Sequence, residues 1–266
     1  MAVQLTLSVV NSHGECQMTS SASDSISLVY TKPYETGDCV KLETDGGANF
    51  YVIQLEDSLM PALVYMTGTE LSYPIPPENN RINHSPKSFT GSCHLIRARV
   101  AKQEEISARR NLAYNPYDTH EGKGFYPHAW ANVETRGEMV FAACNAIDGI
   151  YENNSHGVWP YQSWGINRNP DAFMQVEFGR TVLLDEIRLT LRADFPHDSW
   201  WTSATVVFDD GNEETFALQK SATTQVFKIP LHRTKWIRLE RLRKAFDESP
   251  FPALTQFEAW GVECLP

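Results

Sequence analysis

Residues 173–191 read FMQVEFGRTVLLDEIRLTL, and both ends of this stretch alternate apolar and polar side chains. Met174, Val176 and Phe178 occupy every second position, and residues 186–191, EIRLTL, repeat the pattern. A period of two is typical of a β-strand that buries one face. Because helical periodicity is nearly absent from the chain, these strands predict an all-β fold.

Short strands of this kind, separated by turn residues, run along the whole chain. The first hundred residues contain QLTLSV, SISLVY and HLIRARV, with turn clusters such as TDGG and YPIPPENN between such runs. Asp210–Gly211 predicts a tight hairpin turn between two later strands. Residues 101–113, AKQEEISARRNLA, are the one candidate for a short helix or linker. We therefore expect two β-sandwich domains, residues 1–105 of unknown role and residues 106–266.

The composition argues against several classes of protein. The 266 residues carry a net charge of −10, which does not attract the phosphate backbone of nucleic acids. No run of apolar residues is long enough to span a membrane. The five cysteines are widely spaced and form no C-x-x-C pair, so we expect free thiols rather than disulfides or a zinc site.

The first residues, MAVQLTLSVVNSHGE, lack a basic segment followed by a long apolar run. We therefore identify no signal peptide, and the sequence as it stands predicts a cytoplasmic protein. It predicts a secreted protein if a leader segment has been removed.

The second half contains an ordered series of motifs: NAIDG, FMQVEFG, LDEIRLTL, VVFDDG, KWIRLERL and FEAWG. In this order and spacing, residues 108–266 resemble a discoidin domain, also called the coagulation-factor type C domain. This is a galactose-binding-domain-like jelly roll that includes many bacterial carbohydrate-binding modules. The resemblance implies a lectin-like scaffold in which loops at one end of the sandwich bind the ligand.

One such loop, RADFPHDSWW at 192–201, follows the EIRLTL strand. Sugar recognition requires an aromatic face for the C–H side of a pyranose ring and planar polar groups for its hydroxyls. This loop contains both kinds of group. In the alternative interpretation, the arginine and the first aspartate pair to brace the loop, and a tryptophan fills the core. The candidate ligand-binding residues here are Arg192, Asp194, His197 and one of Trp200 and Trp201.

Two further loops contribute candidate ligand-binding residues. GVWPYQSWGINRNPD, at 157–171, contains Trp159 and Tyr161, and RKAFDESPFPAL, at 243–254, begins with Arg243. We expect one tryptophan of the first loop to belong to the core. The second loop could be a proline-braced crossover whose two phenylalanines cap the core, and we favour that role for Phe251.

The family resemblance also implies a structural calcium ion near Asp148, assisted by Glu258. Calcium takes six or more oxygen ligands, several of them from backbone carbonyls. This sequence departs from the family pattern, because IYENNSHG follows the Asp-Gly pair where a short polar segment with threonine is usual. The alternative is an aspartate that caps its own turn.

These observations together favour a non-catalytic protein or module that recognises a carbohydrate through loops at one end of the C-terminal sandwich. One alternative is a protein-interaction module on the same scaffold, with a protein partner or a second copy of the chain. Another is a glycan-active enzyme with a site at the domain interface. Glu134 with Glu138, or Asp194 with Asp198, would then supply the carboxylate pair. The common catalytic motifs, such as G-x-S-x-G and H-E-x-x-H, are absent.

Overall fold

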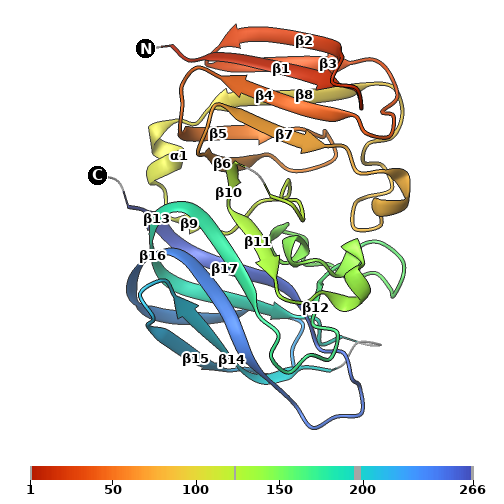
Figure 1. The fold of residues 1–266 in the computed structure, drawn as a ribbon. Coiled ribbons are helices and arrows are strands. Elements are labelled where there is room, and N and C mark those ends of the chain that lie inside the picture. The colour runs from red at the N-terminus through yellow and green to blue at the C-terminus, as the bar shows by residue number, and fades with distance from the viewer. Residues whose placement is uncertain (1, 123, 195–198, 265–266) are drawn as a thin grey trace. The chain divides into compact units, whose positions relative to one another are not determined.

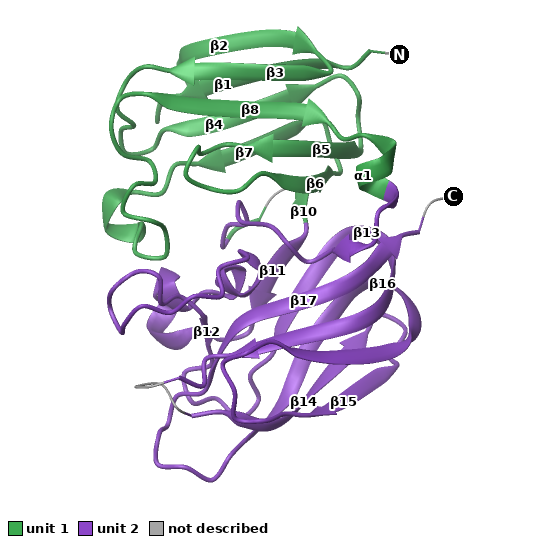
Figure 2. Ribbon diagram, turned by 180° about the vertical axis from the view of Figure 1, so that it is seen from behind, with its two compact units in different colours: residues 1–106, 121–126 green, residues 107–120, 127–266 purple. Residues whose placement is uncertain are grey.

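The computed structural model describes residues 2–122, 124–194 and 199–264. It divides the chain into two compact units (Figure 2). Unit 1 contains residues 1–106 and 121–126, and unit 2 contains residues 107–120 and 127–266. The fold is all-β, with antiparallel sheets and only short helices. None of the described helices has the length and apolar character needed to cross a membrane.

Unit 1 is a sandwich of two antiparallel sheets (Figure 1). One sheet has the strand order β2-β1-β4-β7 and the other has the order β10-β6-β5-β8-β3. The elements of this unit are β1 (Gln4–Val10), β2 (Cys16–Ser23), β3 (Ser25–Tyr30), β4 (Cys39–Thr44), β5 (Asn49–Gln54), β6 (Ala62–Met66), β7 (Glu70–Pro74), η1 (Glu78–Asn80), β8 (His94–Val100) and β10 (Phe125–Tyr126).

The alternation seen in the sequence forms the core of unit 1. Leu5, Leu7 and Val9 of β1 are fully buried, as a strand with one inward face requires. A hydrogen bond of 3.0 Å joins the Thr44 hydroxyl of one sheet to the Tyr51 hydroxyl of the other. Strands β2 and β7 were not identified from the sequence. The burial pattern of β2 contains no fully buried position, so it lacks the apolar alternation on which the prediction relied.

Unit 2 is built on one strand path, β12-β17-β13-β16-β14-β15, with β11 paired to β13 and β9 to β17. The short helix α1 (Gln103–Ser107) and β9 lie within the 101–113 segment, the candidate helix or linker. The elements of this unit are β9 (Arg110–Asn111), β11 (His128–Ala131), η2 (Thr135–Gly137), η3 (Met139–Phe141), η4 (Ala143–Ile147), β12 (Trp164–Gly165), β13 (Met174–Leu191), β14 (Trp201–Phe208), β15 (Glu213–Ala217), β16 (Gln225–Lys244) and β17 (Ala253–Glu263).

The stretch quoted first forms a single long strand, β13, rather than two. Its first part pairs with β11, and its second part, from Val182 on, pairs with β17. The pairing with β16 is interrupted between Glu177 and Val182, where Gly179 adopts a φ of 67°. A backbone with positive φ favours glycine. The side chains that alternate on either side of the interruption face the same core.

The predicted hairpin at Asp210–Gly211 is confirmed, because it joins β14 to β15. Gly211 has a φ of 84°, and its N–H donates a 3.0 Å hydrogen bond to the Phe208 carbonyl. This conformation is favourable for glycine and strained for most other residues.

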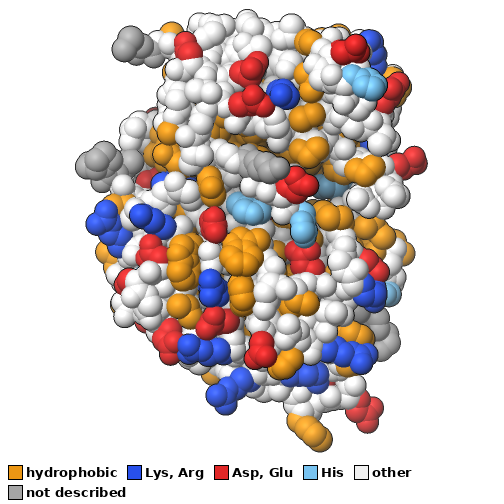
Figure 3. All heavy atoms as spheres, in the orientation of Figure 1, with side chains coloured by type: hydrophobic (Ala, Val, Ile, Leu, Met, Phe, Trp, Pro, Cys, Tyr) orange, Lys and Arg blue, Asp and Glu red, His pale blue; other side chains and the backbone are white. Residues whose placement is uncertain are grey.

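Charged side chains of both signs are interspersed over the face of unit 2 that Figure 3 shows. Glu186 on β13 is buried, and it pairs with three cationic side chains. Burial raises the pKa of Glu186, but hydrogen bonds from Lys228, Arg188 and Arg109 outweigh it and lower the pKa to about 2.

Candidate functional site

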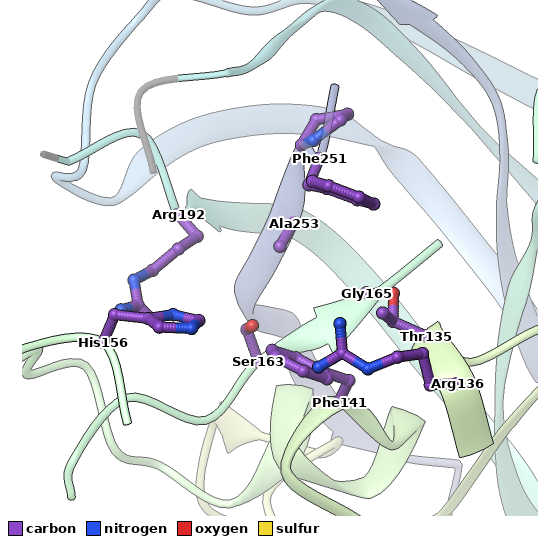
Figure 4. Close-up of a pocket in the computed structure, with 10 residues that line it drawn as sticks. Thr135, Arg136, Phe141, His156, Ser163, Gly165, Arg192, Phe251 and Ala253 are labelled. Atoms are coloured by element: carbon purple, nitrogen blue, oxygen red, sulfur yellow. The ribbon is translucent and has the colours of Figure 1, made fainter. Parts of the chain in front are cut away.

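A cavity of about 260 Å³ lies in unit 2, between the loops that connect its strands (Figure 4). Its walls come from η2, η3, the 155–158 turn, β12, the end of β13 and the start of β17. The lining residues are Thr135, Arg136, Phe141, His156, Ser163, Gly165, Arg192, Phe251, Pro252 and Ala253.

Backbone hydrogen bonds fix these segments to one another. The Arg192 N–H, just past β13, donates to the Ala253 carbonyl at 2.9 Å. The Ser163 N–H donates to the Val140 carbonyl at 3.0 Å. The Thr135 hydroxyl accepts the N–H of Asn167 at 3.0 Å. The cavity wall is thus tied to the ends of regular strands, which position loops more rigidly than free connections do.

Arg192 is buried at the cavity wall, with only 3% of its surface exposed. Its Nε donates to the Asp194 carboxylate at 3.0 Å, and its two terminal nitrogens donate to the Tyr161 carbonyl and to the Asn153 side chain. Asn153 in turn donates to Asp194. A guanidinium carries five N–H donors, so two remain without a partner among the described residues.

A second arginine, Arg136, lies beside Phe141 on the opposite side of the cavity from Arg192 in Figure 4. Its guanidinium donates twice to the Glu138 carboxylate, at 2.6 and 2.8 Å, and lies 5.5 Å from the centre of the Phe141 ring. Arg136 has a φ of 55°, which is unusual for a residue other than glycine. The backbone therefore directs this side chain at some conformational cost.

Phe251 forms another wall, from the segment that leads into β17. Its ring is half-buried, and the Arg168 guanidinium lies 4.3 Å from the ring centre. Figure 4 shows Phe251 and Phe141 on different sides of the cavity, with Ser163 and Ala253 between them. Two aromatic rings therefore border the same small space.

The cavity is close to electrically neutral, because each arginine that lines it has its own carboxylate. Burial lowers the pKa of Arg192, and the nearby Asp194 raises it. Arginine stays charged in proteins because its ordinary pKa is above 12. On the other side, hydrogen bonds from Arg136 lower the pKa of Glu138, so that pair is also ionised.

Three of the residues expected from the sequence lie together. Arg192 lines the cavity, Asp194 pairs with it, and the Tyr161 carbonyl accepts one of its hydrogen bonds. The Tyr161 side chain itself is buried. The bracing pair proposed as the alternative is therefore present, and the same arginine also lines the cavity.

The remaining aromatic candidates lie elsewhere. Trp201 is 1% exposed and packs in the core with Trp164, at 6.4 Å between ring centres. Trp200 is half-buried against the same core, and Trp159 is half-buried outside the cavity lining. Since a buried ring has no free face for a ligand, we do not include Trp201 in the site proposed below.

Arg243 is exposed on β16 and does not line the cavity. His197 and Asp198 lie outside the described residues. Sequence analysis missed Arg136, Phe141 and His156, and it favoured a core role for Phe251. Arg136 and Phe141 lie close to the NAIDG motif in the sequence, which was only a weak indication that they belong to the site. They are far from Arg192 along the chain, so the sequence gave no reason to group them with it.

The two candidate calcium ligands have separate surroundings. Asp148 accepts hydrogen bonds from the Gln162 and Gln256 side chains, at 3.0 and 2.8 Å. Glu258 is buried and accepts the indole N–H of Trp260 at 2.7 Å. Within the described ranges, no three His, Cys, Asp or Glu side chains gather in a metal-binding arrangement.

The carboxylates considered for hydrolysis also have their own partners. Glu134 accepts the Ala143 N–H at 2.8 Å and lies 3.0 Å from His120, whereas Glu138 pairs with Arg136. None of these contacts joins Glu134 to Glu138.

No protein-family model matches this chain, and no curated protein matches it. Among solved structures, it is similar to chitosan-binding module 1 from a chitosanase/glucanase of Paenibacillus sp. IK-5, with 19% identity over 57% of this chain and 99% of that one and a TM-score of 0.40. A fucose-binding module of Streptococcus pneumoniae is 11% identical over 58% and 99%, with a TM-score of 0.42. A Clostridium perfringens module in complex with GalNAc-β-1,3-galactose is 15% identical over 50% and 94%, with a TM-score of 0.38.

Proposed function

We propose that unit 2 binds a saccharide, without covalent chemistry, in the cavity between Phe141 and Phe251. The observation that carries the proposal is the combination of two aromatic rings with an arginine, Arg192, that has two N–H donors beyond those paired with described residues, around one small space. Aromatic faces cover the C–H side of a sugar ring, and fixed planar donors meet its hydroxyls. The Ser163 side chain and His156 add further polar groups to the wall.

The size and charge of the cavity limit the kinds of saccharide that we expect it to bind. Pockets for drug-sized molecules usually start at about 300 Å³, so a cavity of about 260 Å³ suits one sugar ring rather than the middle of a chain. Because both lining arginines already pair with carboxylates, a neutral sugar is favoured over a strongly anionic one.

The test is calorimetric titration of the full chain with a panel of mono- and oligosaccharides, chosen by a glycan array. Phe251→Ala should weaken binding about 5- to 10-fold, because a ring contact contributes roughly 1 kcal/mol. Phe246→Ala is the matched control, since Phe246 lies in the same connection, is fully exposed and does not line the cavity. Absence of any saccharide binding at millimolar concentration would overturn the proposal.

The exposed Phe246 ring favours one second candidate, a protein-interaction module that uses the tip of this connection. In that case Phe246→Ala, rather than Phe251→Ala, would reduce recovery of a co-purifying protein. Calorimetric titration with saccharides would then detect no binding to either variant or to the unmodified chain.

A further inference from the structure

The loop of residues 145–150 is held around the side chain of one residue, Gln256 on β17. Its Nε2 lies 2.8 Å from the Asp148 carboxylate and 3.1 Å from the carbonyls of Asn145 and Ile150, so its two N–H groups are shared among three acceptors. Its Oε1 accepts the Gly149 N–H at 3.0 Å. Gln256 is 1% exposed, so these contacts lie away from bulk water.

Three oxygens of one loop converge on a single point, and oxygen atoms are the ligands that a hard cation takes. Here the point is occupied by an amide nitrogen that carries its own hydrogens. The reverse orientation of the amide would place Oε1 against three oxygens and Nε2 against the Gly149 N–H. The hydrogen-bond pattern therefore fixes the orientation.

A calcium ion does not fit this arrangement. Calcium takes roughly six to eight oxygens at about 2.3–2.6 Å, whereas the centre of this loop already holds nitrogen. The other oxygen of Asp148 accepts the Gln162 amide, and the Ile150 N–H donates to the same carboxylate at 2.8 Å. The Glu258 carboxylate accepts the indole N–H of Trp260.

We propose that the side-chain amide of Gln256 replaces a metal ion in the 145–150 loop, so that this chain keeps the loop closed without calcium. A partly positive N–H₂ group satisfies the converging oxygens as a cation would, at lower charge. The same group of contacts reaches the cavity wall, because Gln162 adjoins Ser163. The proposal does not depend on the identity of the ligand.

The experiment compares thermal unfolding of the full chain, followed by circular dichroism, in millimolar calcium chloride and in EDTA. The unmodified chain should have the same midpoint in both, and calorimetry should detect no calcium binding. Gln256→Glu places a carboxylate against Asp148, so its midpoint should fall in EDTA and rise by about 5 °C or more in calcium.

Gln225→Glu is the matched control, because Gln225 also bridges a loop of unit 2 with its amide but contacts no carboxylate there. Its midpoint should not respond to calcium. A calcium-dependent rise in the unmodified chain would overturn the proposal, as would a Gln256→Glu variant that behaves like the unmodified chain in both buffers.

If Gln256→Glu does not fold, Gln256→Ala keeps the proposal testable. Loss of the amide should lower the midpoint equally in calcium and in EDTA. An unchanged midpoint for Gln256→Ala would show that the amide does not hold the loop, and would also overturn the proposal. Failure here leaves saccharide binding untouched, because that is measured separately by titration.

Discussion

Arg192 lines the cavity with its guanidinium already fixed by three groups of the protein. A side chain held in this way loses little further conformational freedom when a ligand arrives. The cost is burial of a charge, which the partner Asp194 offsets. Bracing and binding are therefore compatible roles for one arginine, although the sequence presented them as alternatives.

Neighbouring tryptophans differ for an equally local reason. Trp201 is the first residue of β14, and its ring is buried in the core. Trp200 precedes the strand, and its ring packs against the same core while staying half-buried. Residue type alone could not have separated the two.

At the same scale, His84 in unit 1 should make stability depend on pH. Burial and the nearby Arg81 lower the pKa of His84 to about 4, from an ordinary value of 6.5. Above pH 6.5 the histidine is neutral in both states. As the pH falls from 6.5 to 4, the unfolded chain binds the proton and the folded chain does not, so up to about 3 kcal/mol of stability is lost.

Urea unfolding of the full chain at several pH values between 4 and 7 tests this expectation. In His84→Gln, the decline in stability over that window should be shallower than in the unmodified chain. Burial also lowers the pKa of His94. We therefore expect His94 to cause part of the decline in stability that remains in the variant. Equal slopes for the two proteins would show that His84 does not titrate in this window.

At the scale of the element, β17 passes very close to β13. A methyl group added to Gly261 would lie 1.9 Å from the Leu183 carbonyl oxygen, where Gly261 pairs with Leu184 on β13. The backbone itself is the obstacle, so no side chain can move aside. Strand pairing at this position therefore requires glycine.

We expect Gly261→Ala to destabilise unit 2 by about 3 kcal/mol or more, because the two strands must separate locally. Gly211→Ala, in the hairpin turn, is the comparison: its added methyl group meets no atom within 4 Å. It should cost only about 1 kcal/mol, from its positive φ. Chemical denaturation measures both, and similar losses would refute the steric explanation.

At the scale of the whole chain, the two units have separate cores but are not separate in sequence. Residues 121–126 belong to unit 1, where Phe125 and Tyr126 pair as β10 with β6, and the chain on both sides of them belongs to unit 2. Phe125 in this segment is 2% exposed. The boundary expected near residue 105 does not account for residues 121–126. A strand of two residues is too short to show a periodic pattern in the sequence.

Phe125→Ala should therefore weaken unit 1, although the residue follows the start of unit 2 in the chain. Truncation of a buried phenylalanine costs about 3–5 kcal/mol. Hydrogen exchange should rise in β6 and its neighbours, with much less change in β13 and β17. Exchange that rises mainly in β13 and β17 would contradict the assignment of this segment to unit 1.

Local sequence patterns were sufficient to predict the all-β class, most strand positions, the Asp210–Gly211 hairpin and the position of Arg192 directly after a strand. These features depend on local periodicity and turn chemistry, which neighbouring residues encode. The continuity of β13 through Gly179 was not visible, because Gly179, Arg180 and Thr181 interrupt the apolar alternation.

The set of side chains that share the cavity could be read only from the folded chain. Arg136, Phe141, His156 and Phe251 come from four separate segments, and no spacing rule along a chain relates them to Arg192. The same holds for Gln256, which meets Asp148 from 108 positions away. Packing of whole strands sets these distances, so periodicity predicts the scaffold, and the folded chain alone brings its loop residues together.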